Sequence, residues 1–419
     1  MGKTLAQKIL QRHSLDEVKE AGRIVQCRTS MVLANDITAP LAIDSFRKMG
    51  ASKVFDREKV ALVCDHFTPN KDIASAEQVK KVREFAREMD VLHYYEGGNV
   101  GVEHALLPEL GLVGPGDVVV GADSHTCTYG GLGAFATGMG STDIAAAMAL
   151  GQTWFKVPET IKVNISGQPE KYLTSKDLIL YLIGLIGVDG ALYRALEFGG
   201  PVVDEMDIEA RMTMANMAIE AGGKAGLFPA DAKTVEYCGN NGFASPKEIY
   251  PDEDATYCRE VDIDVTGMAP QIACPHLPDN VRSVDELINI RLDQVVLGSC
   301  TNGRISDLRQ AAEIIKGHKV HRDVRFIVLP ATPRIYEQAL DEGLLSIFLK
   351  AGGIVGPPTC GPCLGGHMGI LAAGERCLAT TNRNFKGRMG SLESEVYLGS
   401  PIVAAASAVA GEIINPDKM

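Results

Sequence analysis

The chain has 419 residues, of which 46% are hydrophobic and 22% are charged. This is the composition of an ordinary globular protein with room for two or three domains. The formal net charge of -12 argues against a nucleic-acid partner, because phosphate binding requires a basic surface. The longest apolar run, residues 178–188, is too short to span a bilayer, and residues 1–14 lack the apolar core of a signal peptide. We therefore expect a cytoplasmic protein that binds neither nucleic acid nor membrane.

Short apolar runs alternate with amphipathic stretches along the whole chain. The runs predict strands at residues 60–64, 91–95, 118–121, 160–165, 261–265, 294–297, 324–329 and 377–381. The amphipathic stretches predict helices at residues 75–89, 174–186, 207–221, 305–316 and 333–342. Such alternation is typical of an α/β protein whose strands are covered on both faces. Proline-containing connections at residues 156–159 and 275–280 divide the chain into three predicted domains, residues 1–158, 159–280 and 281–419.

Polar motifs follow several of the predicted strands directly. They are Asp65-His66, Asp123-Ser124-His125 and Ser299-Cys300. In open α/β sheets, ligands bind at the carboxyl ends of the strands, so these motifs mark a candidate site. An aspartate beside a histidine can orient the imidazole for general acid-base catalysis. A single pair of this kind is also common in ordinary loops, but two pairs at strand ends favour the catalytic interpretation.

Three cysteines in the last third of the chain are its most informative feature. Cys300 lies in L-G-S-C-T-N-G, and Cys360 and Cys363 lie in P-T-C-G-P-C-L-G. Three thiolates without an evident fourth ligand suit a 4Fe-4S cluster with one iron open to water or substrate. The C-G-P-C sequence also occurs in thioredoxin-like redox proteins, and a structural zinc site could recruit His367 or Cys377.

Two further features could serve a carboxylate substrate or a catalytic site. Arg383 and Arg388 lie in the turn N-R-N-F-K-G-R, and arginine binds carboxylates through a bidentate fork. A solvated basic surface is the alternative. Glu220 is a carboxylate on the otherwise apolar stretch of residues 212–221, where the alternative is a buried salt bridge.

Together, these motifs identify the chain as resembling the aconitase superfamily. The resemblance rests on C-D-H, A-D-S-H-T followed by G-G-L-G, S-C-T-N, C-G-P-C-L-G and N-R-N-F-K-G-R, in this order over nearly the whole chain. It implies three α/β domains packed around a 4Fe-4S cluster held by Cys300, Cys360 and Cys363, and a hydro-lyase acting on a small hydroxy-dicarboxylate.

The resemblance also implies a role for each matching residue. His66, oriented by Asp65, would protonate the departing hydroxyl group. The residues around the reacting water would be His104, Asp123, His125 and Glu220. Substrate contacts would come from Asn35, Ser124, Asn216, Arg383 and Arg388. Asn35 stands where single-chain aconitases have a glutamine, so its role is the least secure of these.

One departure from single-chain aconitases bears on the partner. Those enzymes continue into a fourth, swivelling domain that carries the catalytic serine base and another substrate arginine, and no motif of this sequence replaces them. The resemblance is to members whose active site is divided between two chains, and it implies a small subunit that carries the swivel domain. An iron-sensing RNA-binding protein and a zinc-stabilised interaction module remain the non-enzyme alternatives.

Overall fold

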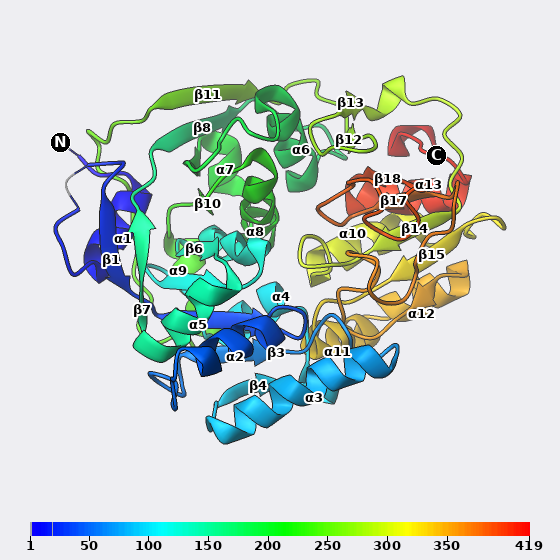
Figure 1. Cartoon of the computed structure of the whole chain (residues 1–419). Coiled ribbons are helices and arrows are strands. Elements are labelled where there is room, and N and C mark those ends of the chain that lie inside the picture. Colours follow the sequence, from blue (N-terminus) through cyan, green and yellow to red (C-terminus); the bar gives the residue numbers. More distant parts are fainter. Residues whose placement is uncertain (1, 19) are drawn as a thin grey trace. The chain divides into compact units, whose positions relative to one another are not determined.

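The computed structural model describes residues 2–18 and 20–419 (Figure 1). The chain forms two compact units, each built from segments that are far apart in the sequence. Unit 1 contains residues 1–97, 106–167 and 191–264, and unit 2 contains residues 98–105, 168–190 and 265–419. The chain first passes from unit 1 to unit 2 at the 3-10 helix η1 (Gly97–Asn99), and it returns within α4 (Glu103–Glu109).

Unit 1 contains a five-stranded parallel sheet with the strand order β4-β3-β2-β5-β6. Its strands are β2 (Met31–Asn35), β3 (Val60–Val63), β4 (His93–Tyr95), β5 (Val118–Gly121) and β6 (Phe135–Gly138). Every residue of β2, β3 and β5 is buried, as expected for a parallel sheet covered on both faces. The helices of this region are α1 (Leu5–His13), α2 (Ala39–Lys48), α3 (Ile73–Glu88) and α5 (Ser141–Leu150).

A second parallel sheet of unit 1 has the strand order β10-β9-β8-β11. Its strands are β8 (Thr160–Ser166), β9 (Ala195–Gly199), β10 (Ala225–Leu227) and β11 (Arg259–Asp264). The accompanying helices are α7 (Pro201–Glu205), α8 (Ile208–Asn216) and α9 (Ala232–Asn240), with the 3-10 helices η2 (Ser124–Leu132) and η3 (Met217–Ala221). Strands β1 (Ile24–Arg28) and β7 (Gln152–Lys156) form a separate antiparallel ribbon.

Unit 2 is built on a seven-stranded mixed sheet with the order β13-β12-β18-β17-β14-β15-β16. The strands are β12 (Gln271–Ala273), β13 (Val281–Ser283), β14 (Gln294–Leu297), β15 (Arg325–Val328), β16 (Ile354–Val355), β17 (Arg376–Ala379) and β18 (Glu395–Leu398). The five strands from β18 to β16 run parallel, whereas β12 is antiparallel to both of its neighbours.

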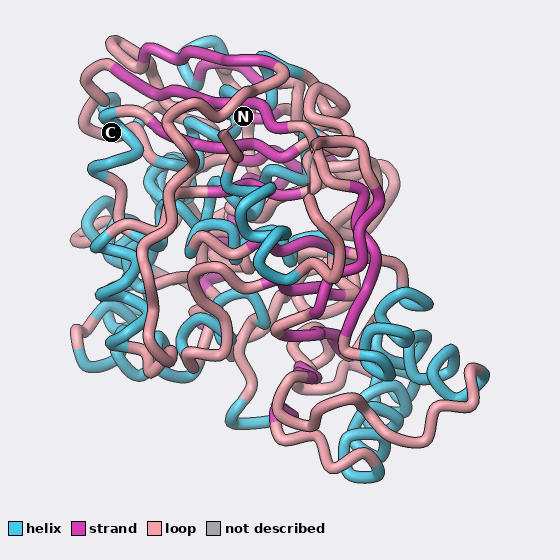
Figure 2. The backbone as a smooth tube through the Cα atoms, turned by 90° about the vertical axis from the view of Figure 1, so that its left-hand side faces the viewer, coloured by secondary structure: helices cyan, strands magenta, loops and turns pink. Residues whose placement is uncertain are grey.

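The helices of unit 2 pack against this sheet and against one another. They are α6 (Ser175–Ile186), α10 (Ile305–Ile315), α11 (Pro333–Asp341), α12 (Leu344–Ala351) and α13 (Pro401–Ala410), with the 3-10 helices η4 (Val284–Glu286) and η5 (Pro416–Lys418). Figure 2 distinguishes the helices from the strands along the backbone. In the parallel part of the sheet, β14, β16 and β17 are each followed by a loop at the carboxyl end of the strand.

The predicted α/β class is confirmed, and most predicted elements are present with small shifts at their ends. The predicted helix 207–221 is wrong in one respect, because it ends as α8 at Asn216 and continues as the 3-10 helix η3. The strands of the β1–β7 ribbon were not predicted. No helix in the described part of the chain combines the length and hydropathy needed to cross a membrane. The division into three domains stays a prediction.

Candidate functional site

The Asp65-His66 pair lies just beyond the carboxyl end of β3, as predicted. His66 Nδ1 is 2.7 Å from Asp65 Oδ1, and both side chains are buried. A second carboxylate, Asp36, follows β2 and is completely buried. Its two oxygens accept hydrogen bonds from the backbone N–H groups of His66 (3.1 Å) and Phe67 (2.7 Å). Asp36 Oδ1 also lies 3.5 Å from His66 Nδ1, so two carboxylates surround the same imidazole nitrogen.

Asp36 is a residue that the sequence analysis missed. Its position immediately after the predicted substrate residue Asn35 was the available signal, and that position does not indicate His66 as the partner. Asn35 itself uses its side-chain oxygen locally, since Oδ1 accepts from Ile37 N and Thr38 N, both at 3.1 Å. This turn precedes α2, so the structure gives Asn35 a turn-forming contact. Its role in substrate binding stays a prediction.

A second cluster of predicted residues forms beyond the carboxyl end of β5, also within unit 1. The His125 ring lies between two carboxylates, with Nε2 2.8 Å from Glu220 Oε1 and Nδ1 3.4 Å from Asp123 Oδ1. Asp123 Oδ1 also accepts from the backbone N–H of His125 at 2.7 Å. Asn216 donates from Nδ2 to Thr128 Oγ1 at 2.8 Å. Four predicted residues therefore come together here: Asp123 and His125 at the start of η2, Asn216 at the end of α8 and Glu220 on η3.

Glu220 is a buried carboxylate that contacts another predicted site residue. It lies on η3, the 3-10 continuation of α8, and it is 4% exposed. Because an apolar surface does not offset the cost of a buried carboxylate, such a group needs a partner. His125 is that partner, at a sequence separation of 95 residues. The buried salt bridge that the sequence analysis gave as the alternative for Glu220 thus has its counterpart in this buried contact with a histidine, and the partner is itself a predicted site residue.

The three cysteines lie on two loops of unit 2 that leave the same edge of the parallel sheet. Cys300 follows β14, and Cys360 and Cys363 follow β16. All three are buried, with exposed fractions of 5–6%. The side chain of Asn382, which follows the adjacent strand β17, joins two of them. Its Nδ2 donates to Cys300 Sγ at 3.2 Å, and the Cys363 thiol donates to its Oδ1 at 3.7 Å.

The donor set fits a metal group held by thiolates. Arg388 Nη2 lies 3.9 Å from Cys363 Sγ, so an amide and a guanidinium both approach these sulfur atoms. Hydrogen bonds and positive charge of this kind stabilise thiolates and the metal groups they bind. Cys377 does not belong to the set, because it pairs with Gln294 at the amino end of β14, whereas Cys300 lies beyond the carboxyl end. Burial raises the pKa of the Cys377 thiol to about 12, which suits an inert core thiol.

The predicted substrate arginines lie in the loop after β17. Arg383 stacks over Phe385, with its guanidinium carbon 6.0 Å from the ring centroid. Both arginines are half-buried. Asn384, which is fully buried, donates from Nδ2 to the Cys274 carbonyl at 2.8 Å and fixes the loop between the two arginines.

His104, at the start of α4, is buried beside Glu103, with His104 Nε2 3.6 Å from Glu103 Oε1. The substrate contacts of Arg383 and Arg388 and the role of His104 stay predictions.

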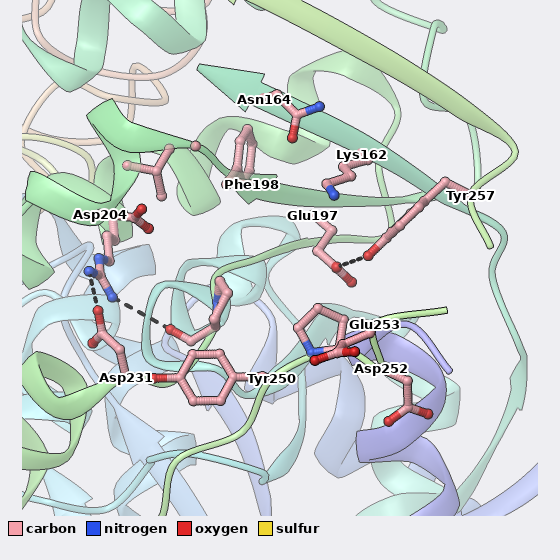
Figure 3. A pocket seen from close by; sticks show the side chains of 16 residues that line it. Lys162, Asn164, Glu197, Phe198, Asp204, Asp231, Tyr250, Asp252, Glu253 and Tyr257 are labelled. Atoms are coloured by element: carbon pink, nitrogen blue, oxygen red, sulfur yellow. Dashed lines mark hydrogen bonds and ion pairs between the residues drawn. The ribbon is translucent and has the colours of Figure 1, made fainter. Parts of the chain in front are cut away.

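Unit 1 also contains a cavity of about 420 Å³ that none of the predicted residues lines. Figure 3 shows residues that line it, among them Lys162 and Asn164 of β8, with Glu197 and Tyr257 pointing toward each other. The Tyr257 hydroxyl donates to Glu197 Oε1 at 2.5 Å, and Lys162 lies over the Tyr257 ring. Burial raises the pKa of Glu197, whose other oxygen accepts from Leu5 N at 2.8 Å. These contacts attach the N-terminal helix to the sheet, and we assign the cavity no catalytic role.

Comparison with known proteins gives the class of this chain. It belongs to the aconitase family (aconitate hydratase), whose pattern it matches over residues 7–290 and 285–411. A crystal structure of Thermococcus kodakaraensis aconitase X in its holo-form has the same type of fold, with a TM-score of 0.50, 15% identity and coverage of 93% of each chain. At that identity the likeness concerns the fold alone.

The sequence relatives are much more similar. The chain is 69% identical to the 3-isopropylmalate dehydratase large subunit of Nitratidesulfovibrio vulgaris (strain DSM 19637 / Miyazaki F), covering 100% of both chains. It is also 69% identical to the protein of that name from Oleidesulfovibrio alaskensis, with 99% coverage of both chains. The corresponding protein of Acetivibrio thermocellus is 60% identical and is likewise matched over its full length.

Proposed function

We propose that this chain is the large, cluster-bearing subunit of a 3-isopropylmalate dehydratase, a cytoplasmic hydro-lyase that interconverts 2- and 3-isopropylmalate in leucine biosynthesis. The observation that carries the proposal is the group of three buried thiols at one sheet edge of unit 2, two of which Asn382 joins. Full-length identity of 60–70% to proteins of that name supports the substrate.

The proposed cofactor is a 4Fe-4S cluster on Cys300, Cys360 and Cys363. When bound, it would supply a Lewis acid that polarises the hydroxyl group to be removed. The division into three domains around this cluster belongs to the same proposal.

The chain's own residues would handle the protons and the substrate. His66, held by Asp65 and Asp36, would donate a proton to the departing hydroxyl group, because its ring is fixed in a buried, carboxylate-lined position. His125, between Asp123 and Glu220, together with His104, would orient the water. Asn35, Ser124 and Asn216 would contact the substrate, and Arg383 and Arg388 would hold its carboxylates through bidentate hydrogen bonds.

The proposed partner is a separate small subunit that carries the swivel domain. Trans elimination of water needs a base for the carbon-bound proton, and the site residues proposed above include a proton donor and carboxylate ligands but no such base. The relatives are named large subunits, which supports a partner of this kind. The small subunit would contribute the base and a further substrate contact.

An anaerobic isomerisation assay tests this proposal. The purified chain with a reconstituted cluster should be inactive alone and should gain activity as the small subunit is added. Removing an essential base lowers rates by about 10²- to 10⁴-fold. Turnover by the isolated chain at the rate of the mixture would contradict the divided site. Homocitrate and 2,3-dimethylmalate serve as competing substrates, and preferential turnover of either would reassign the substrate within the family.

A further inference from the structure

Lys176 is a fully buried lysine that the proposed mechanism does not use. It lies in the first turn of α6, and its exposed fraction is 0%. Its ammonium nitrogen donates to two backbone carbonyls, Thr380 O at 2.8 Å and Thr381 O at 2.6 Å. Moving an ammonium group out of water is unfavourable, and attraction to a partner charge does not always offset this cost. A charged side chain in this buried position therefore indicates that the charge has a role.

The negative groups around Lys176 identify that use. Burial lowers the pKa of its ammonium to about 7, and the charges of Asp307, Cys300, Asp177 and Cys363 oppose this shift in that order. Electrostatic coupling between two sites is reciprocal. Because negative charge at Cys300 and Cys363 favours the ammonium form of Lys176, the ammonium equally favours negative charge on a group held by these two residues.

The contacts of Lys176 also lead to the same thiols through the backbone. Thr380 and Thr381, whose carbonyls it holds, directly precede Asn382 in the loop after β17. The Asn382 side chain in turn joins Cys300 Sγ at 3.2 Å and Cys363 Sγ at 3.7 Å. Fixing the two carbonyls therefore fixes the start of the segment that presents the amide to both sulfur atoms. Lys176 is therefore linked to the thiol site by its charge and by its hydrogen bonds to the backbone, the first of which joins it to Thr380, 204 residues later in the chain.

We propose that Lys176 is a positioning residue and a buried counter-charge for the thiolate site of Cys300 and Cys363. It holds the Asn382 segment in place, and its charge stabilises added negative charge on the group that the thiolates bind. The inference rests on the proposed function in that this group would be the 4Fe-4S cluster. Lys176 touches neither substrate nor reacting atoms in this role.

The test replaces Lys176 by methionine, which keeps the length of the side chain and removes the charge. The readout is the one-electron midpoint potential of the cluster in the full chain, followed by electron paramagnetic resonance. Without the ammonium, the reduced form should become about tenfold less favoured, which corresponds to a fall of about 59 mV. Lys171→Met is the matched control, because Lys171 is an exposed lysine five positions away, and its potential should equal that of the unmodified chain.

A second readout needs no cluster and separates failure of this inference from failure of the proposed function. In the cluster-free chain, the rate of Cys300 alkylation at pH 7 should fall several-fold in Lys176→Met, because the thiolate is the reacting form. Iron and sulfide analysis of the unmodified chain tests the cluster itself. A chain that binds no cluster but shows the slower alkylation would overturn the proposed function and leave Lys176 as the counter-charge of the thiols.

Circular dichroism melts establish that the variants fold, and Lys176→Gln, which retains a donor for one carbonyl, provides a second neutral variant. If both fail to fold, nitrogen NMR of lysine-labelled, unmodified chain decides. A protonated, exchange-protected Lys176 at pH 6 supports the counter-charge, and a neutral amine at that pH overturns it. Unchanged potential and alkylation rate in a folded neutral variant would also refute the proposal.

Discussion

Asp36 gives the sharpest test of how the fold prepares His66. Its two carboxylate oxygens accept from the backbone N–H groups of His66 and Phe67, at 3.1 and 2.7 Å. Asp36→Asn keeps the shape of the side chain but offers one oxygen instead of two, and its amide nitrogen then faces a backbone donor. One charge-assisted hydrogen bond is lost, which costs roughly 1.5–3 kcal/mol in the free energy of unfolding.

The same substitution should slow the reaction. The loop that carries the imidazole would relax, and a displacement of about 1 Å in a catalytic group can cost up to about 10²-fold in rate. We expect kcat to fall roughly 10- to 100-fold in the anaerobic isomerisation assay with the small subunit present. Urea unfolding curves measure the stability change in parallel.

Asp44→Asn is the matched control, because Asp44 lies on the nearby helix α2, with a side chain 49% exposed and paired with Lys81. Exposed pairs contribute about 0–1 kcal/mol, so this variant should resemble the unmodified chain in both measurements. If Asp36→Asn loses stability but keeps its kcat, Asp36 serves the fold alone and the reasoning about His66 is refuted. If Asp36→Asn and Asp44→Asn have the same free energy of unfolding and the same kcat, the predicted loss of a charge-assisted hydrogen bond is refuted as well.

Further substitutions test the cysteines, His66, the two arginines and Asp177. Replacing any of the three predicted cluster cysteines by serine should abolish iron and sulfide binding, whereas Cys377→Ser should retain it. Equal loss in all four variants would contradict the exclusion of Cys377 from the cluster ligands. His66→Ala should lower kcat about 100-fold or more with the iron content unchanged, and full activity would exclude His66 as the acid. Arg383→Lys and Arg388→Lys should weaken transition-state binding by roughly 2–4 kcal/mol, measured as kcat/KM, and unchanged values would return both residues to ordinary surface. Burial raises the pKa of Asp177 to about 6, above its ordinary value of about 3.9. The folded chain therefore binds this proton more tightly than the unfolded chain, and the free energy of unfolding should fall as the pH rises from about 4 to about 6. Asp177→Asn should remove this part of the pH dependence, as measured by urea unfolding.

The sequence was informative wherever local pattern and position coincide. Short apolar runs such as β5 and β14 were predicted with their observed bounds, and the motifs beyond them lie at strand ends as expected. Contacts between distant residues were not predictable in the same way. Asp36 reaches His66 across 30 residues, and nothing in its own neighbourhood marks it as a partner of that histidine. The break from α8 into η3 was also missed, because buried apolar residues continue across it, with Met214 and Ala215 before the break and Met217 and Ala218 after it.

The interleaving of the two units has a consequence for how the chain folds as it leaves the ribosome. Helix α6 is rich in buried leucine and isoleucine, and its residue Asp177 accepts a hydrogen bond from Gln271 N, 94 residues later in the chain. At about 5–20 residues per second, the helix waits roughly 5–20 s for that partner strand and still longer for the segment that Lys176 holds. During this interval an apolar helix is exposed, so nascent chains of this length are the expected clients of chaperones that bind exposed apolar segments.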